Sequence, residues 1–298
     1  MVYAVKPPMQ GQPMSAARPY HTRHQNTRQR RLRQLPALIT VGGAIALAAI
    51  GQLVVNPRLT PPPAVSGDAL AAFPQVILWA WERPELLDFI DPHAVGVAFL
   101  ARTLYLSGPD VIVRPRLQPL SVPREAKLIA VVRIEADRLR PPDLSSQQRE
   151  VAAAAIAAVS GLQGSGALQV DFDAAVSQRA FYRDVLWELR RQLPTSMPLS
   201  MTALASWCIH DNWLAGLPVD EVVPMVFRMG ADRDRVRRYL ADDDFRAAPC
   251  RRSLGISTDE PLPTLQAAQR LYIFHPQPWR PAALSSELEE VRRWFVKP

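Results

Sequence analysis

The sequence has few of the residues that bind structural metals, and it lacks a phosphate-binding loop. It contains two cysteines and five histidines among 298 residues, and these do not form a zinc-finger spacing. His275, in the string FHPQPW, has no second histidine at metal-ligand spacing. No glycine-rich loop follows the first apolar run, LWAWERPE, which argues against a nucleotide-binding doubly wound sheet. We therefore expect no metal and no other cofactor.

Acidic residues are absent from residues 1–34, which hold all of the excess positive charge. The formal net charge of the chain is +7. The cations of this arm are Lys6, Arg18, Arg23, Arg28, Arg30, Arg31 and Arg33. Because charge confined to a terminal arm does not make a folded basic groove, and no RNP-like aromatic motif accompanies it, we expect no nucleic-acid partner.

Residues 35–55, from Leu35 to Val55, form an uncharged apolar stretch directly after this basic arm. A helix of that length roughly matches a hydrocarbon layer about 30 Å thick, so the lipid bilayer is an expected partner. The positive-inside bias predicts a single-pass inner-membrane protein with a cytoplasmic arm and a periplasmic C-terminal domain. The alternative is secretion to the periplasm after signal cleavage, because Ala46-Leu47-Ala48 offers a small-x-small site.

A proline-rich segment separates this stretch from the remainder of the chain. Residues 56–72 have the composition of a semi-rigid linker, and the folded domain is expected over residues 73–298. Export would place Cys208 and Cys250 in an oxidising space. A bridge between them would close a loop of roughly 42 residues and contribute roughly 4 kcal/mol; two separate buried thiols are the alternative.

Eight short apolar runs follow the linker and predict eight strands. They are VILWAW from Val76, VGVAFL from Val95, LIAVVRIE from Leu128, ALQVDFD from Ala167, PLSMTALAS from Pro198, EVVPMVF from Glu221, SLGIS from Ser253 and RLYIF from Arg270.

Helical patterns lie between several of these runs and after the last one, over residues 145–159, 177–193, 233–240 and 284–295. Strands that alternate with helices predict a parallel sheet, and eight repeats predict an α/β fold of the (β/α)8 TIM-like barrel type. The domain is short for such a barrel, so some βα units are expected to be trimmed. The connection between the second and third runs can form a hairpin in place of a helix, and Pro224 interrupts a proposed strand.

A parallel barrel places its working groups at the C-terminal ends of its strands. Alternation along each strand turns polar residues two apart toward the barrel axis. We also expect Arg102, from the second strand, and Trp207, after the fifth, at this rim. The residues expected there from five other strand ends are Trp79, Trp81, Glu82, Arg133, Glu135, Asp171, Asp173, Ser200, Thr202, Ser257, Asp259 and Glu260.

Carboxylates and tryptophans at one rim suit sugar chemistry, because an indole face stacks on a pyranose ring and two carboxyl groups can flank a glycosidic bond. For a hydrolase, we expect Asp173 and Glu135 to be the catalytic pair and Asp171 to tune Asp173, with Asp259 or Glu260 as a reserve acid. The structural alternatives are ion pairs of Arg133 with Glu135 or of Arg102 with Asp171, and tryptophans that cap the core.

Several strings resemble an uncharacterised bacterial family, domain of unknown function 3142, over roughly residues 75–280. Among them are LWAWERPE, VAFLARTLYL, LQVDFDAAVSQRAFYRDVL and CRRSLGISTDEP. That family brings no established activity. At Asp171 and Asp173 the fourth run also resembles the D-x-D-x-E signature of chitinase-like family 18 glycoside hydrolases, whose catalytic glutamate position is occupied here by Ala175. The resemblance implies a barrel similar to glycoside hydrolases without that family's catalytic acid.

These observations lead to one leading hypothesis and two alternatives. The leading hypothesis is a membrane-anchored envelope protein whose barrel binds or hydrolyses a cell-envelope polysaccharide, with enzymatic activity left open. The first alternative is a non-catalytic barrel that recognises a glycan or a partner protein, which Ala175 favours. The second is an envelope scaffold whose barrel has no ligand.

Overall fold

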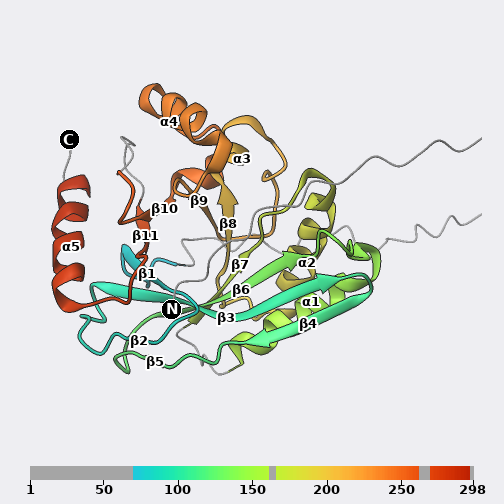
Figure 1. Cartoon of the computed structure of the whole chain (residues 1–298), viewed down its shortest axis with the longest axis horizontal. Helices are drawn as coiled ribbons and strands as arrows, with labels where there is room; N and C mark the ends of the chain where they lie inside the picture. Colours follow the sequence, from blue (N-terminus) through green and yellow to red (C-terminus); the bar gives the residue numbers. More distant parts are fainter. Residues whose placement is uncertain (1–69, 161–165, 262–268, 296–298) are drawn as a thin grey trace, which may run out of the picture. The chain divides into compact units, whose positions relative to one another are not determined.

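The computed structural model describes residues 70–160, 166–261 and 269–295, and its centre is a closed barrel of eight parallel strands (Figure 1). The barrel closes because β1 pairs in parallel with both β3 and β11. The eight strands predicted from the apolar runs are thus the eight barrel strands, and the α/β barrel is confirmed. In order around the barrel they are β1 (Val76–Ala80), β3 (Val95–Ser107), β6 (Leu128–Ala136), β7 (Gly166–Asp171), β8 (Leu199–Leu204), β9 (Glu221–Met225), β10 (Ser253–Ser257) and β11 (Arg270–Phe274).

Alternation along the strands sorts the buried side chains into two clusters. The smaller cluster includes Ile77, Trp79, Ile129 and Val131, whereas the intervening residues of the same strands belong to a larger cluster shared with the helices. Because successive strand residues point to opposite faces, the smaller cluster fills the barrel and the larger one lies under the helices. Phe172 belongs to the outer cluster, as the alternation around Asp171 and Asp173 predicts.

Trp79 fits inside the barrel because Gly255 on β10 leaves space for its indole ring. A Cβ atom added to Gly255 would lie 2.8 Å from Cη2 of Trp79, which is too close for two carbon atoms. Glycine at this position therefore lets the β10 backbone approach the indole. The indole Nε1 donates a hydrogen bond to Oε1 of Gln169, 3.1 Å away.

Five helices accompany the barrel in the described ranges, and some βα units lack one, as expected for a short chain. Helices follow β6, β7, β8, β9 and β11. Three short 3-10 turns precede α2, α4 and β10. The helices are α1 (Leu144–Val159), α2 (Arg179–Gln192), α3 (Ala205–His210), α4 (Arg233–Asp242) and α5 (Pro281–Phe295); the turns are η1 (Val176–Gln178), η2 (Gly230–Asp232) and η3 (Ala248–Arg251).

Helix α1 shows how the local sequence sets an element. It begins after Asp143, whose Oδ1 accepts a hydrogen bond from the backbone N–H of Ser145 at 3.2 Å and so caps the first turn. Val151, Ala155 and Val159 recur at four-residue spacing and are buried, which gives the helix one apolar face toward the sheet. Small alanine side chains on that face allow close packing.

The connection between β3 and β6 is a hairpin, as the sequence allowed. β4 (Asp110–Pro115) pairs antiparallel with the C-terminal half of β3, from Arg102 to Ser107, whereas the N-terminal half of β3 pairs with β1. The register against β6 shifts between Leu100 and Arg102, which marks a bulge where β3 leaves the closed barrel. The strand pair β2 (Glu85–Leu86) and β5 (Leu120–Ser121) completes this helix-free side.

Pro224 lies within β9 and is tolerated there because the strand is weakly paired on one side. β9 has five paired residues with β8 but a single bridge to β10, between Met225 and Gly255. Proline cannot donate to a ladder, so a central strand containing it loses pairing.

A buried polar network closes the N-terminal end of the barrel, and we call it the base network. The Glu221 carboxylate lies 2.8 Å from Nη1 of Arg270 and accepts hydrogen bonds from Tyr272 Oη at 2.6 Å and Ser200 Oγ at 3.0 Å. The Ser253 hydroxyl also donates to Glu221. Every member is buried, and its two charged groups, Glu221 and Arg270, are paired with each other.

The N-terminal predictions fall largely outside the described residues. The basic arm of residues 1–34, the apolar stretch of residues 35–55 and most of the linker of residues 56–72 precede residue 70. Within the described ranges, no helix has the length and apolar character needed to cross a membrane.

Candidate functional site

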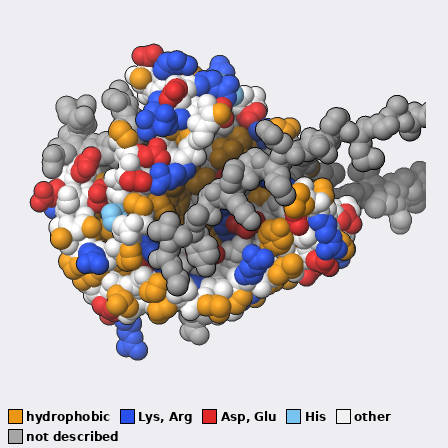
Figure 2. Space-filling model, viewed as in Figure 1, with side chains coloured by type: hydrophobic (Ala, Val, Ile, Leu, Met, Phe, Trp, Pro, Cys, Tyr) orange, Lys and Arg blue, Asp and Glu red, His pale blue; other side chains and the backbone are white. Residues whose placement is uncertain are grey.

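A cavity of about 330 Å³ lies at the C-terminal ends of the barrel strands. Figure 2 shows apolar side chains on the wall of a hollow on this face of the molecule. The lining residues come from six of the eight strands and from the loops that follow them. They are Trp79, Trp81, Arg133, Asp171, Asp173, Thr202, Leu204, Ala205, Ser206, Met225, Phe227, Arg228, Met229, Asp232, Val236 and Phe274. The rim expected from the strand ends is thus a hollow with aromatic, apolar and charged walls.

Arg133 and Thr202 hold Asp171 in the cavity wall. Nη1 of Arg133 lies 3.1 Å from Oδ2 of Asp171, and the Thr202 hydroxyl donates to Oδ1 at 2.7 Å. Burial raises the pKa of the Asp171 carboxyl above its ordinary value, although Arg133 and Thr202 act in the opposite direction. Both oxygens of Asp171 are therefore already bonded to protein groups.

Asp173 is the carboxylate of the cavity without a partner. It is exposed, and it makes no hydrogen bond or ion pair with any other described residue. Partial desolvation raises its pKa, and the negative charge of Asp171 raises it further, while Arg133 lowers it. An exposed carboxyl group with a raised pKa can accept hydrogen bonds from a ligand or give up a proton to one.

Glu135 belongs to a second cavity of about 620 Å³ beside the first one. Its Oε1 lies 2.8 Å from Nε of Arg133, so the same guanidinium binds Glu135 and Asp171. The second cavity lies over the ends of β6 and β7, and it shares Arg133, Asp171 and Asp173 with the first. The ion pair of Arg133 with Glu135 that the sequence offered as a structural alternative is present.

Asp259 and Glu260 bind Arg228 on the rim. Nη2 of Arg228 lies 2.6 Å from Asp259, and its Nη1 and backbone N–H lie 3.3 Å and 2.9 Å from Oε1 of Glu260. Hydrogen bonds from Ser257 and Arg228 lower the pKa of Asp259. A carboxyl group held ionised by two donors is poorly suited to act as an acid, and neither residue lines the first cavity. The expected reserve acids are therefore partners of an arginine.

Arg228 itself has an uncommon backbone conformation. Its φ is 51°, in the left-handed region that few residues other than glycine adopt. The two carboxylates and the bonded backbone N–H stabilise that conformation, which places Arg228 in the cavity lining. Strained backbone held by its surroundings is typical of ligand-binding sites.

The two tryptophans at the end of β1 have different environments. Trp79 is 3% exposed and forms part of the barrel core, so only its edge reaches the cavity. Trp81 is half-buried and lines the cavity, with the Arg133 guanidinium 5.7 Å from its ring centroid. Trp81 thus fits the expectation of an aromatic platform, whereas Trp79 fits the alternative of a core residue.

Four residues expected at the rim lie elsewhere. Ser200 is buried in the base network, where it bonds Glu221. Arg102 does not pair with Asp171; its guanidinium reaches the carbonyl oxygens of Ala154 and Ala157 near the end of α1, at 3.4 Å and 3.0 Å. Trp207 is 3% exposed and packs edge-on against Trp213, because α3 turns it into the outer core. Glu82 lines a small separate pocket and accepts a hydrogen bond from Thr103 at 3.5 Å.

Two aromatic residues of the cavity were not predicted as site residues. Phe227 and Phe274 stack with ring centroids 5.7 Å apart and planes at 8°, and Phe227 also contacts Trp79. Phe227 follows β9 and Phe274 ends β11. The rule that selected residues at other strand ends applies equally here and could have found both.

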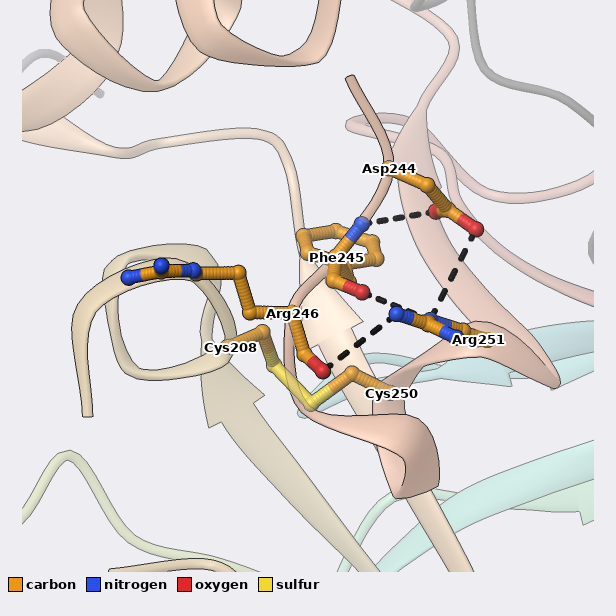
Figure 3. Close-up of a disulfide and its surroundings, with 6 residues drawn as sticks. All are labelled: Cys208, Asp244, Phe245, Arg246, Cys250 and Arg251. Carbon is orange, nitrogen blue, oxygen red and sulfur yellow. Dashed lines mark hydrogen bonds and ion pairs between the residues drawn. A yellow bond between two sulfur atoms is a disulfide. The ribbon is translucent and has the colours of Figure 1, made fainter. Parts of the chain in front are cut away.

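Cys208 and Cys250 form a disulfide, with Cα atoms 5.9 Å apart across a separation of 42 residues (Figure 3). The bridge joins α3, which follows β8, to η3, which precedes β10. The backbone N–H of Ala247 donates to the carbonyl oxygen of Cys208 at 3.0 Å, and Nε of Arg251 donates to the carbonyl oxygen of Phe245 at 2.7 Å. Ala205 and Ser206, at the start of the same helix, line the cavity. The bridge therefore fixes one wall of the site.

His275 has the environment of a strand-end histidine. Its Nδ1 lies 2.6 Å from the Thr258 hydroxyl, its ring stacks on Trp279, and desolvation lowers its pKa. Over the ranges that the structure describes, no group of three or more His, Cys, Asp or Glu side chains is arranged to hold a metal ion.

Comparison with known families finds one match. Residues 124–236 match a domain of unknown function (DUF3142). This segment runs from just before β6 to the start of α4, and so contains Arg133, Glu135, Asp171, Asp173, Thr202 and Arg228. No curated protein and no solved structure matches the chain.

Proposed function

We propose that this barrel binds a cell-envelope polysaccharide in the cavity at the C-terminal ends of its strands. The observation that carries the proposal is that Asp173, which has no partner among the described residues, lines the same cavity as aromatic and apolar side chains. An aromatic ring that packs on the apolar face of a sugar, combined with a carboxylate that accepts hydroxyl hydrogen bonds, is suited to saccharide recognition.

The pairing of the carboxylates favours binding over hydrolysis. A hydrolase that uses two carboxyl groups needs both of them available to the glycosidic bond or to water. Glu135 and Asp171 share Arg133, and Asp259 and Glu260 share Arg228. Among the carboxylates in the described part of the cavity wall, only Asp173 lacks a partner. The two-carboxylate mechanism needs a second available carboxyl group.

The raised pKa of Asp173 supports a second candidate function, hydrolysis of the same polysaccharide. A carboxyl group protonated nearer to neutral pH can protonate a leaving-group oxygen, and Asp173 is the residue for that role. Glu135 would have to leave Arg133 in order to act as its partner. This requirement places hydrolysis second.

One experiment separates the two candidates. The purified full-length protein is screened on a glycan array and, with the glycans that bind, for release of shorter saccharides. Asp173→Asn should weaken binding roughly tenfold for a lost charged hydrogen bond. Glu150→Gln, an exposed carboxylate on the outer helix α1, is the matched control and should change nothing. Saccharide release by the native protein that Asp173→Asn abolishes would establish the second candidate, and a clean negative for binding and release would remove both.

The envelope location rests on the sequence of residues 35–55. We propose that this stretch anchors the protein in the inner membrane with the barrel in the periplasm, and that signal cleavage is the alternative. Fractionation together with the size of the mature protein tests this. Full-length protein in the membrane fraction, with a barrel accessible to protease only after the outer envelope is opened, is the expected result; a shortened soluble form would favour cleavage.

A further inference from the structure

The two cavities at the rim meet at the same three side chains. The first, with Trp81, Phe227 and Phe274 in its wall, we call the aromatic compartment; the second, with Tyr105, Glu135, Asp137, Arg138 and Gln178 in its wall, we call the polar compartment. Both are lined by Arg133, Asp171 and Asp173. Side chains common to two linings lie between the hollows, so the compartments form one groove with Asp173 near its middle.

The polar compartment contains more carboxylates than cations. Its acids are Glu135, Asp137, Asp171 and Asp173, and its cations are Arg133 and Arg138. Asp137 stays ionised because it accepts hydrogen bonds from Leu139 N at 2.9 Å and Ser107 Oγ at 2.8 Å, which lower its pKa. An anionic ligand unit would therefore meet repulsion in this compartment.

The arginines of the aromatic compartment offer no compensation for an anionic ligand. Arg133 is bound by Asp171 and Glu135, and Arg228 is bound by Asp259 and Glu260. A carboxylate or phosphate on the ligand would have to displace protein carboxylates from either guanidinium. A hydroxyl or ammonium group, in contrast, finds Asp173 free within the described cavity wall.

We propose that the groove takes an extended saccharide of at least two units, neutral or amino-bearing rather than acidic, with one unit on the aromatic wall and the next over the polar compartment. This rests on the proposed function and adds the length and charge of its ligand. Asp173 lies at the junction, where it accepts a hydrogen bond from one of the two units.

Chain length and charge are tested together with defined probes. Binding of glucosamine, N-acetylglucosamine and galacturonic acid, each as monomer and linear tetramer, is measured by calorimetry on the full-length protein. The tetramers of the first two should bind at least about tenfold tighter than their monomers, and tetragalacturonate at least about tenfold weaker than either.

The outcomes distinguish this inference from the proposed function. Monomers that bind as tightly as tetramers would overturn the extended groove and leave saccharide binding intact. Tetragalacturonate as the tightest ligand would overturn the charge assignment. Absence of binding to these probes and to a glycan array would remove the proposed function, and this inference with it.

A matched pair of variants locates the second unit. Leu139 is 97% exposed at the polar compartment, and Leu117 is 87% exposed outside both compartments. Leu139→Ala should weaken tetramer binding roughly threefold for lost apolar contact without changing monomer binding, and Leu117→Ala should change neither. Equal effects of Leu139→Ala on monomer and tetramer, or no effect on either, would contradict the placement of the second unit.

Discussion

The base network and the rim of the barrel contain the same kinds of residue, but these residues are paired in different ways. At the base, Glu221 and Arg270 are buried and every bond is made within the protein. At the rim, Arg133 joins Asp171 and Glu135, and Asp173 beside them has no hydrogen bond or ion pair with another residue that the structure describes. Carboxylates and arginines therefore do not by themselves indicate a binding site. A carboxylate that has no protein partner, such as Asp173 among the described residues, does.

This difference follows from desolvation. Buried charges are tolerated only when they are fully paired, which makes the base network an all-or-none arrangement. At the rim, Asp173 is exposed and only partly desolvated, so an unpaired carboxylate costs less there than in the core and is available to a ligand. The two regions should accordingly respond to substitution in opposite ways, in stability at the base and in binding at the rim.

Loss of the base carboxylate is the most damaging change we predict. Glu221→Ala leaves the buried Arg270 guanidinium without a counter-charge and should lower the free energy of unfolding by about 3 to 5 kcal/mol. Glu135→Ala, which breaks a partly exposed pair of Arg133, should lower it by less than about 1 kcal/mol. Urea denaturation of both variants measures the difference. Similar losses of unfolding free energy in the two variants would show that the two arginine pairs contribute equally to stability. That result would contradict the difference between base and rim.

The disulfide joins two segments outside the barrel strands, the helix α3 that follows β8 and the turn η3 that precedes β10. Replacing both Cys208 and Cys250 by alanine should lower the free energy of unfolding by about 2 to 4 kcal/mol, because the unfolded chain regains the freedom of a long loop. Denaturation of the native protein with and without reductant is the independent check. The prediction is contradicted if the double variant has the same urea midpoint as the oxidised native protein. A shift that reductant causes in the native protein would then not arise from loss of this bridge.

The hydrogen-bonded chain from the base to the cavity passes through Trp79. Its indole donates to Gln169, whose Nε2 donates to Ser200 at 3.1 Å, and Ser200 donates to Glu221. Trp79→Phe should lower the free energy of unfolding by about 2 kcal/mol, because a buried amide oxygen loses its donor and a void remains. Trp81→Phe at the rim should cost less than about 1 kcal/mol and weaken saccharide binding instead. Thermal melts measure the stability of both variants, and calorimetry measures their saccharide binding. If only Trp79→Phe lost binding, Trp79 and not Trp81 would be the ring that contacts the ligand.

The sequence predicted the barrel because the relevant signals are local. Each strand is a short apolar run between turns, and alternation places Asp171 and Asp173 on one face without reference to any distant residue. The start of α3 was hidden for the same reason. Ala205 continues the apolar run of β8, so no change of pattern marks the end of the strand at Leu204.

The pairing of the charges could not be predicted, because it depends on contacts between distant loops. Arg228 reaches Asp259 across 31 residues, and it does so with a left-handed backbone that a sequence pattern does not reveal. Glu221 looked like the first residue of a strand, yet its partner Arg270 lies 49 residues away. Residue types and strand ends predicted part of the cavity lining, including Trp81, Asp171 and Asp173. The fold shows which of its charged side chains are paired with one another.

The smallest effect we predict concerns the free carboxylate. Because the pKa of Asp173 is raised in the folded protein, the folded state holds its proton more tightly than the unfolded chain does. This contribution favours folding below the unfolded pKa of about 3.9 and is lost as the pH rises through the folded pKa. Asp173→Asn should therefore stabilise the protein at neutral pH by less than about 1 kcal/mol, since solvent screens the group, and the gain should vanish near pH 4 or below. Thermal melts across this range measure the gain, with Glu150→Gln as the control. Destabilisation by Asp173→Asn at neutral pH would mean that the carboxylate has a stabilising partner, and the distinction between base and rim would then fail at the residue on which it depends.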